Sequence, residues 1–173
     1  RHPAFPMNRS GAKPPPTRPV GAVRIIGGEW RSTRLPVADR AGLRPSADRV
    51  RETLFNWLQP MMPGARVLDL FAGSGALGLE AVSRGAREAV LVEHDPQLAE
   101  GLRQLAAKLP GGERVQVVWA QALAGLDGCL ADEAWLYVES PASSPAVPGL
   151  VWRLHREGQT REVRYALYRR GQA

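Results

Sequence analysis

The sequence predicts an α/β fold built on a mainly parallel sheet, with an antiparallel hairpin at the C-terminal end. Apolar strand-like runs alternate with amphipathic helical stretches between residues 66 and 119. A glycine-rich turn joins the first of these strands to the first helix, and two alternating runs close the chain around a short connection. Strands joined by helical crossovers form a parallel sheet that helices cover on both faces.

The N-terminal third predicts a tail, a hairpin and one helix. Residues 1–21 are rich in proline and lack apolar periodicity, so we expect a disordered basic tail. Residues 23–35 have the pattern of a short hairpin, and Ser46 is a good N-cap for a helix that follows. That helix places four apolar side chains on one face: Val50, Leu54, Trp57 and Leu58. Prolines 60 and 63 then end a unit of residues 22–62 and begin a second unit, 63–173.

The second unit divides into strands and helices in alternation. We expect strands at residues 66–70, 89–93 and 115–119, and a helix at 76–84 that Gly85 closes. Asp95 and Pro96 open a second helix, whose apolar face carries leucines 98, 102, 105 and 109. A fourth strand is expected at 135–139. The final hairpin pairs residues 151–156 with 163–168, and its connection includes residues 158–161.

Length and composition exclude several classes of protein. The 173 residues, of which 44% are hydrophobic and 23% charged, suit one globular domain with a core. No apolar run has the length of a membrane-spanning helix, and no apolar leader is present, so we expect a soluble cytoplasmic protein. The single cysteine, Cys129, makes an internal disulfide or a cysteine-rich zinc site impossible. We expect no metal, and we take a monomer as the simplest state.

Charge is distributed unevenly around a net value of +6. Residues 1–60 carry a net charge of +7, residues 61–152 carry −5, and the last 21 residues carry +4. All but two of the 23 basic residues are arginines, which bind phosphates bidentately and stack on bases. The pattern favours a polyanionic partner, although genome composition alone also produces a high arginine content.

The turn at residues 71–78 carries the strongest chemical signal. Gly73 and Gly75 follow a strand, and Gly78 lies inside the next helix. Glycines there allow a tight turn and a close approach of the backbone to a ligand at a helix N-terminus. Glu93 ends the second strand 18 residues after Gly75, where a carboxylate can accept both hydroxyls of a ribose. The pattern predicts a nucleoside-bearing cofactor, and a phosphate-binding P-loop is excluded because no Lys-Ser/Thr follows.

Asp69 favours S-adenosylmethionine over a dinucleotide. It lies within the apolar strand, four residues before Gly73, where an ionised carboxylate is costly without a partner. A pyrophosphate would be repelled there, whereas an ammonium and a sulfonium would be attracted. Two structural alternatives stay open, in which Asp69 caps loop amides and Glu93 caps the entry to the next helix.

Several long blocks resemble the RsmD-type family of bacterial 16S ribosomal RNA guanine-N2 methyltransferases. They are VRIIGGEWRSTRLPV, LRPSADRVRETLFNWL, VLDLFAGSGALGLEA, ADEAWLYVES, WRLHRE and YALYRR, together with Glu93 after VLV. The resemblance implies a class I, Rossmann-like methyltransferase fold with a small N-terminal extension. It implies S-adenosylmethionine as the methyl donor and 16S ribosomal RNA, in the small subunit or its precursor, as the acceptor.

The same resemblance implies roles for individual residues. The expected cofactor-binding residues are Asp69, Phe71, Ala72, Gly73, Ser74, Gly75, Glu93, His94, Gln121 and Ala122. The expected RNA-binding residues are Arg24, Arg31, Arg34, Arg44, Arg49 and Arg51, of which the first five would meet RNA phosphates or order the cofactor pocket. For these arginines, a simply solvated face is the open alternative.

The catalytic motif of the family is absent. Amino-group methyltransferases of this kind carry Asn/Asp-Pro-Pro-aromatic at the end of the fourth sheet strand, and this sequence has none, so no catalytic residue is assigned. Only eleven residues, 123–133, separate the third predicted strand region from the next, where the fold needs a helix, a strand and a helix of roughly 30 residues.

Loss of that central strand should leave the sheet split. We therefore expect a segment to be missing from this sequence after about Asp127. The alternative is a catalytically inactive RNA-binding or ribosome-assembly module that retains the cofactor fold. A third hypothesis, an NAD-dependent oxidoreductase, is motivated only by the glycine spacing.

Overall fold

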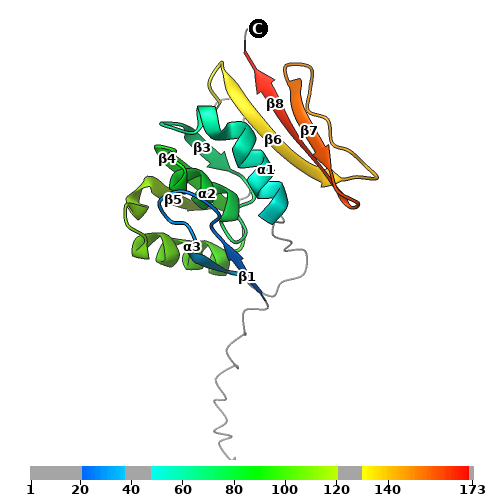
Figure 1. Cartoon of the computed structure of the whole chain (residues 1–173). Coiled ribbons are helices and arrows are strands. Elements are labelled where there is room, and N and C mark those ends of the chain that lie inside the picture. Colours follow the sequence, from blue (N-terminus) through cyan, green and yellow to red (C-terminus); the bar gives the residue numbers. More distant parts are fainter. Residues whose placement is uncertain (1–20, 38–47, 121–129, 172–173) are drawn as a thin grey trace, which may run out of the picture.

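The computed structural model describes residues 21–37, 48–120 and 130–171 (Figure 1). Predictions that concern the tail, Ser46, Arg44, Gln121, Ala122, Cys129 and the position near Asp127 lie outside the described residues. Within the described part, no helix is long and apolar enough to cross a membrane.

The N-terminal unit contains the predicted hairpin and helix. Strands β1 (Gly21–Arg24) and β2 (Arg34–Val37) are antiparallel, and Val23 lies opposite Leu35. Helix α1 (Asp48–Leu58) buries Val50 and Leu54 as its apolar spacing predicts, and it buries Phe55 as well. The short 3-10 helix η1 (Gln59–Met61) ends it at the expected prolines.

Three parallel strands form the first sheet. They are β3 (Arg66–Asp69), β4 (Glu88–Glu93) and β5 (Val115–Trp119), in the order β3-β4-β5. Helix α2 (Ala76–Ser83) connects β3 to β4, while α3 (Pro96–Lys108) and the 3-10 helix η2 (Gly112–Arg114) connect β4 to β5. These boundaries confirm the predicted alternation to within two residues.

Helix α3 begins as the sequence predicts, but its buried face is turned slightly. Asp95 caps the helix, because its side chain accepts hydrogen bonds from the amides of Gln97 and Leu98. The buried positions are Ala99, Leu102 and Ala106. The other predicted leucines, 98, 105 and 109, are half-buried, since small alanines let the helix lie closer to the sheet.

The C-terminal strands form a second, antiparallel sheet. Strands β6 (Ala134–Pro141), β7 (Arg153–Gln159) and β8 (Val163–Arg170) lie in the order β6-β8-β7. The hairpin is confirmed, but its connection is shorter than predicted because Gly158 and Gln159 belong to β7. Outside the N-terminal hairpin, the described strands thus form one parallel and one antiparallel sheet of three strands each, which fits the predicted α/β fold with an antiparallel C-terminal end.

The split expected from the missing central strand is observed. No pairing joins β3 to β6 among the described residues, although the two strands run in the same general direction in Figure 1. One hydrophobic core still spans β1, β2 and the first sheet, and it includes Leu167 of β8. The rings of Trp57 in α1 and Tyr165 in β8 lie 5.7 Å apart. Side-chain packing, not a shared strand ladder, therefore connects the two sheets.

Candidate functional site

The glycine turn lies between the end of β3 and the start of α2. Gly73 and Gly75 have φ values of 54° and 77°, in the left-handed region that favours glycine. The amide of Ala72 donates to the carbonyl oxygen of Val92 at 3.0 Å, which ties the turn to β4. A Cβ on Gly78 would lie 2.6 Å from Leu91 Cδ1, so this glycine lets α2 pack closely on the sheet.

Glu93 is buried beneath this turn, with 4% of its surface exposed. Its Oε2 accepts a hydrogen bond from the Gly73 amide at 2.9 Å, and its Oε1 accepts one from the Asp95 amide at 2.8 Å. The second bond is the helix-entry cap that the sequence left open as an alternative. Each carboxylate oxygen has two acceptor positions, so Oε2 keeps one for a ribose hydroxyl, while His94 Nδ1 lies 3.1 Å from Oε1.

Asp69 caps the turn from the side of β3. Its Oδ2 accepts from the Gly78 amide at 3.2 Å, and its Oδ1 lies 3.4 Å from the Phe71 amide. Burial raises the pKa of Asp69 above its usual value of 3.8, because the charged form is desolvated, and the carboxylate of Glu93 adds to this shift. The structural alternative for Asp69 is thus also observed, and a cation bound nearby would stabilise its charged form.

Aromatic side chains stand around the two carboxylates. Phe71 is 72% exposed and Trp119 is 62% exposed, while the imidazole of His94 lies beside Glu93, with Nδ1 3.1 Å from Oε1. The indole N–H of Trp119 donates to the carbonyl oxygen of His94 at 3.0 Å. The edge of the first sheet therefore combines two carboxylates, a helix N-terminus and open aromatic surfaces.

This donor set fits S-adenosylmethionine. The buried carboxylate of Glu93 suits ribose hydroxyls, and the electrostatically unfavourable position of Asp69 suits the ammonium or sulfonium of the methionine part. Of the predicted cofactor residues, the structure brings Asp69, Glu93 and His94 together with the glycine turn, residues 71–75. Among the described residues, no group of three or more potential ligands could hold a metal ion.

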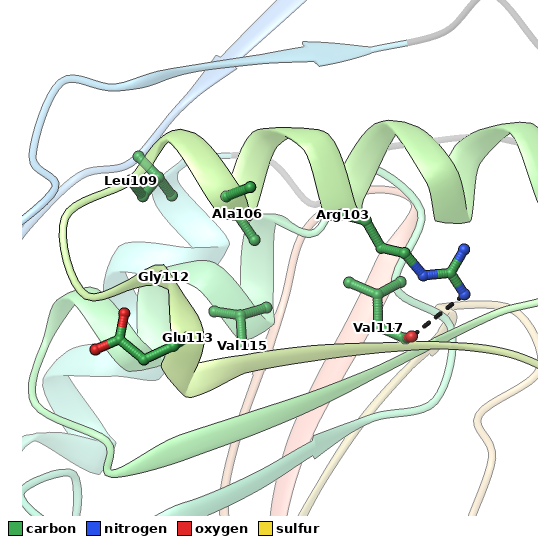
Figure 2. A pocket seen from close by; sticks show the side chains of 8 residues that line it. Arg103, Ala106, Leu109, Gly112, Glu113, Val115 and Val117 are labelled. Carbon is green, nitrogen blue, oxygen red and sulfur yellow. Dashed lines mark hydrogen bonds between the residues drawn. The ribbon is translucent and has the colours of Figure 1, made fainter.

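A pocket lies elsewhere, away from these carboxylates. It has a volume of about 430 Å³ and lies between the C-terminal half of α3 and β5 (Figure 2). Arg103 crosses its margin and donates to the carbonyl oxygen of Val117, while Leu109 and Val115 line its apolar part. None of the predicted cofactor residues lines this pocket, so we do not assign the cofactor to it.

The predicted RNA-binding arginines fall into two groups. Arg24, Arg31, Arg34 and Arg49 are exposed. Arg51 is completely buried, and its guanidinium bonds to Asp48, to Glu80 and to the carbonyl oxygen of Arg24. Its prediction as an RNA contact is therefore wrong, because RNA cannot reach a side chain without exposed surface.

The loop between β1 and β2 is docked against α2. Glu80, also fully buried, accepts hydrogen bonds from the amides of Ile26 and Gly27. Ser83 Oγ donates to the carbonyl oxygen of Gly27 and accepts from the Trp30 amide. This contact lies at the C-terminal end of α2, about 12 Å along the helix axis from the glycine turn.

The contact between this loop and α2 also fixes the position of Arg31. Arg31 follows Trp30 directly, and the Trp30 indole N–H donates to the carbonyl oxygen of Pro110, beyond α3. Arg31 therefore lies at the end of the first sheet opposite the cofactor carboxylates. The structure does not bring Arg31 together with the cofactor residues.

Two residues in these regions were not assigned to a site by sequence reasoning. Glu80 is the one charged side chain in the otherwise uncharged helix ALGLEAVS, and a buried charge of this kind requires partners. Trp119 ends its strand directly opposite Glu93 in the β4–β5 register. Both residues are visible in the sequence, but only the folded structure shows which elements they contact.

Comparison with known proteins relates this chain to methyltransferases. Residues 23–129 match the family model described as Conserved hypothetical protein 95. Ribosomal RNA small subunit methyltransferase D of Escherichia coli K12 is 44% identical over 182 aligned positions, which cover 87% of this chain and 91% of the relative. The Haemophilus influenzae protein of the same name is 35% identical and covers 86% of this chain and 94% of the relative.

Solved structures agree with this result. Methyltransferase yhhF from E. coli superimposes with a TM-score of 0.75 at 41% identity, over 87% of this chain and 99% of that one. A methylase from H. influenzae gives a TM-score of 0.71 at 32% identity, over 88% of this chain and all of that one. Their fold is the Rossmann-like methyltransferase fold that the sequence predicts.

The alignment also measures the internal gap. Because 87% of 173 residues is about 150, about 30 of the 182 positions aligned with the E. coli relative have no counterpart here. This agrees with the length of one strand and its flanking helices. The chain belongs to the RsmD family of methyltransferases.

Proposed function

We propose that this protein transfers a methyl group from S-adenosylmethionine to the exocyclic N2 of a guanine in 16S ribosomal RNA. The proposed substrate is the small ribosomal subunit or its precursor, and the protein acts as a monomer in the cytoplasm. The observation that supports this most is the 44% identity to the E. coli enzyme across nearly the whole chain. The arrangement of Glu93 and Asp69 around the glycine turn supports the same cofactor.

The described residues would perform the binding half of the reaction. S-adenosylmethionine supplies an electrophilic methyl group on a sulfonium. Glu93 would accept hydrogen bonds from the ribose hydroxyls, and Asp69 would interact with the positive methionine end. Phe71, which is largely exposed beside Asp69, would shield the reacting centre from water.

The acceptor half needs residues that this sequence lacks. The guanine amine shares its lone pair with the ring and is a poor nucleophile. Acceptors from a side chain and a backbone carbonyl must hold its hydrogens so that the lone pair faces the methyl carbon. We propose that these acceptors lie in the segment of about 30 positions that the relative has and this chain does not.

We propose that residues 22–62 form the RNA-facing unit and that Arg24, Arg34 and Arg49 contact phosphates. Replacing Arg34 by alanine should weaken RNA binding and reduce the slope of log affinity against log salt by about 0.7 to 0.9 per lost phosphate contact. Arg87→Ala is the matched control, since Arg87 is exposed on the first sheet outside this unit. An equal loss in both variants would contradict the assignment.

The experiment that tests the proposed function is methyl transfer by the protein isolated from its own cells. Its intact mass is measured first, because about 30 further residues would add about 3 to 4 kDa at roughly 110 Da per residue. Labelled S-adenosylmethionine is then added to small subunits that lack the modification. We expect the larger mass and transfer to guanine N2. Normal cofactor binding without transfer by the larger protein would contradict the proposal.

A second function is favoured by the split between the sheets. If the isolated protein has the mass of the 173-residue chain, we propose an RNA-binding or ribosome-assembly module that retains the cofactor fold without catalysis. Such a module would bind small-subunit RNA and S-adenosylhomocysteine but would transfer nothing. The mass and the transfer assay together separate the two functions.

A further inference from the structure

Trp119 occupies an unusual position at the end of β5. It is paired in register with Glu93, the final residue of β4. Its side chain is 62% exposed, whereas Val115, at the start of the same strand, is buried. A large apolar ring is thus left open at the sheet edge where the two carboxylates lie.

The indole is held in one orientation. Its N–H donates to the carbonyl oxygen of His94 at 3.0 Å, which uses the single hydrogen-bond donor of the ring. Since that donor is occupied, Trp119 can offer a ligand only its aromatic face. A fixed and open aromatic face suits a flat, conjugated group.

The sheet geometry indicates which flat group this is. Adjacent strands lie about 4.8 Å apart, and residues paired in a parallel register point to the same face of the sheet, so a ribose bound by Glu93 would lie near Trp119. The base of a nucleoside is attached directly to its ribose and must occupy neighbouring space. The imidazole of His94 is 79% exposed and lies beside Glu93.

We infer that Trp119 forms a wall of the subsite for the adenine of the cofactor and positions the base by stacking. This inference rests on the cofactor of the proposed function. Trp119 makes no bond to the reacting methyl group, so it is a binding residue and not a catalytic one.

Isothermal titration with S-adenosylhomocysteine measures affinity without any need for catalysis, and the change in tryptophan fluorescence on binding is a second readout. Trp119→Ala should weaken affinity about tenfold, as expected for loss of one base–aromatic stack. Trp119→Phe keeps an aromatic face and should bind within about threefold of the unmodified protein, but it should lose most of the fluorescence change. Adenosine, which lacks the amino acid, should lose affinity by the same factor in Trp119→Ala.

Trp152→Phe is the matched control. Trp152 precedes β7 in the second sheet region, where the guanidinium of Arg170 lies 5.7 Å from its ring. This variant should retain both the affinity and the fluorescence change. A circular dichroism melt of each variant shows that the fold is intact.

The outcomes separate the inference from the proposed function. If the unmodified protein binds S-adenosylhomocysteine and Trp119→Ala binds it equally well, the inference is wrong and the cofactor assignment stands. A loss of RNA affinity alone in Trp119→Ala would assign the ring to an RNA base and would also overturn the inference. If the unmodified protein binds no S-adenosylhomocysteine, the cofactor assignment fails, and the inference fails with it.

Discussion

The two sheets of this protein differ in how completely their neighbours cover them. In β4 four of six residues are buried, whereas in β7 all but Gly158 are exposed. The first sheet is covered by α2, α3 and the N-terminal hairpin, and its carboxyl edge holds Asp69 and Glu93. The second sheet contributes only Leu167 to the buried core cluster. The first sheet is therefore packed among its own neighbours, and no strand among the described residues joins it to the second sheet.

Strand β3 shows where that element belongs. Val67 and Leu68 are only half-buried, although a strand at the centre of a parallel sheet is normally buried on both sides. Strand β6 is similarly half-buried from residue 134 to 138. One strand between them would restore a single continuous sheet.

The largest expected effect follows from restoring the strand between β3 and β6. A chimera that carries the corresponding segment of the E. coli relative after Asp127 should transfer methyl groups at least ~1000-fold faster than the 173-residue chain, because it regains the groups that position the amine. Labelled transfer to undermethylated small subunits is the measurement. A glycine-serine segment of equal length is the control, and equal rates for both insertions would contradict the split-sheet account.

Ion pairs in the two regions should differ strongly in their contribution to stability. Glu80→Ala removes the buried carboxylate that pairs with Arg51 and that accepts hydrogen bonds from two backbone amides. We therefore expect the free energy of unfolding to fall by about 3 to 5 kcal/mol. Glu157→Ala removes a solvent-facing partner of Arg164 in the second sheet and should cost less than about 1 kcal/mol. Urea unfolding measures the free energy of unfolding of both variants. Equal losses would show that the contact between the β1–β2 loop and α2 does not stabilise the fold.

Two glycines with the same backbone conformation test how closely the β1–β2 loop packs on α2. Gly28 and Gly64 have φ values of 79° and 75°, but a Cβ on Gly28 would lie 1.8 Å from the Ser83 carbonyl oxygen, and one on Gly64 would meet nothing within 4 Å. Gly64→Ala should cost only the left-handed strain of about 1 kcal/mol. Gly28→Ala should cost at least about 2 kcal/mol more, since the loop must leave α2. Thermal unfolding of the pair is the check, and similar melting temperatures would contradict close docking.

The smallest expected effect is a pH dependence that comes from Asp69. Because burial raises its pKa in the folded state, the protonated carboxyl stabilises the fold below pH 3.8, and this contribution is lost as pH rises through the folded pKa. Asp69→Asn cannot ionise, so its stability relative to the unmodified protein should increase with pH above about 4. Urea unfolding across this range is the measurement. The control, Asp132→Asn at an exposed position near the second sheet, should show no such trend.

The helices, the strands and the glycine turn could be predicted from the sequence because their sequence signals are local. Asp95 and Pro96 define a helix start, and the glycines of residues 73–78 define a strand-to-helix turn, without any knowledge of distant residues. Arg51 was assigned wrongly because its partner, Glu80, lies 29 residues away and only packing brings them together. The position of Trp119 opposite Glu93 depends on strand register, which periodicity alone does not determine.

The central claim is that the first sheet alone forms a complete cofactor site. Isothermal titration of the 173-residue chain with S-adenosylhomocysteine tests it most directly, with Glu93→Ala as the variant and Glu113→Ala, on the short helix before β5, as the control. The account predicts one binding site per chain that is lost in Glu93→Ala and unchanged in Glu113→Ala. Absence of binding by the unmodified chain, or equal binding by Glu93→Ala, would contradict it.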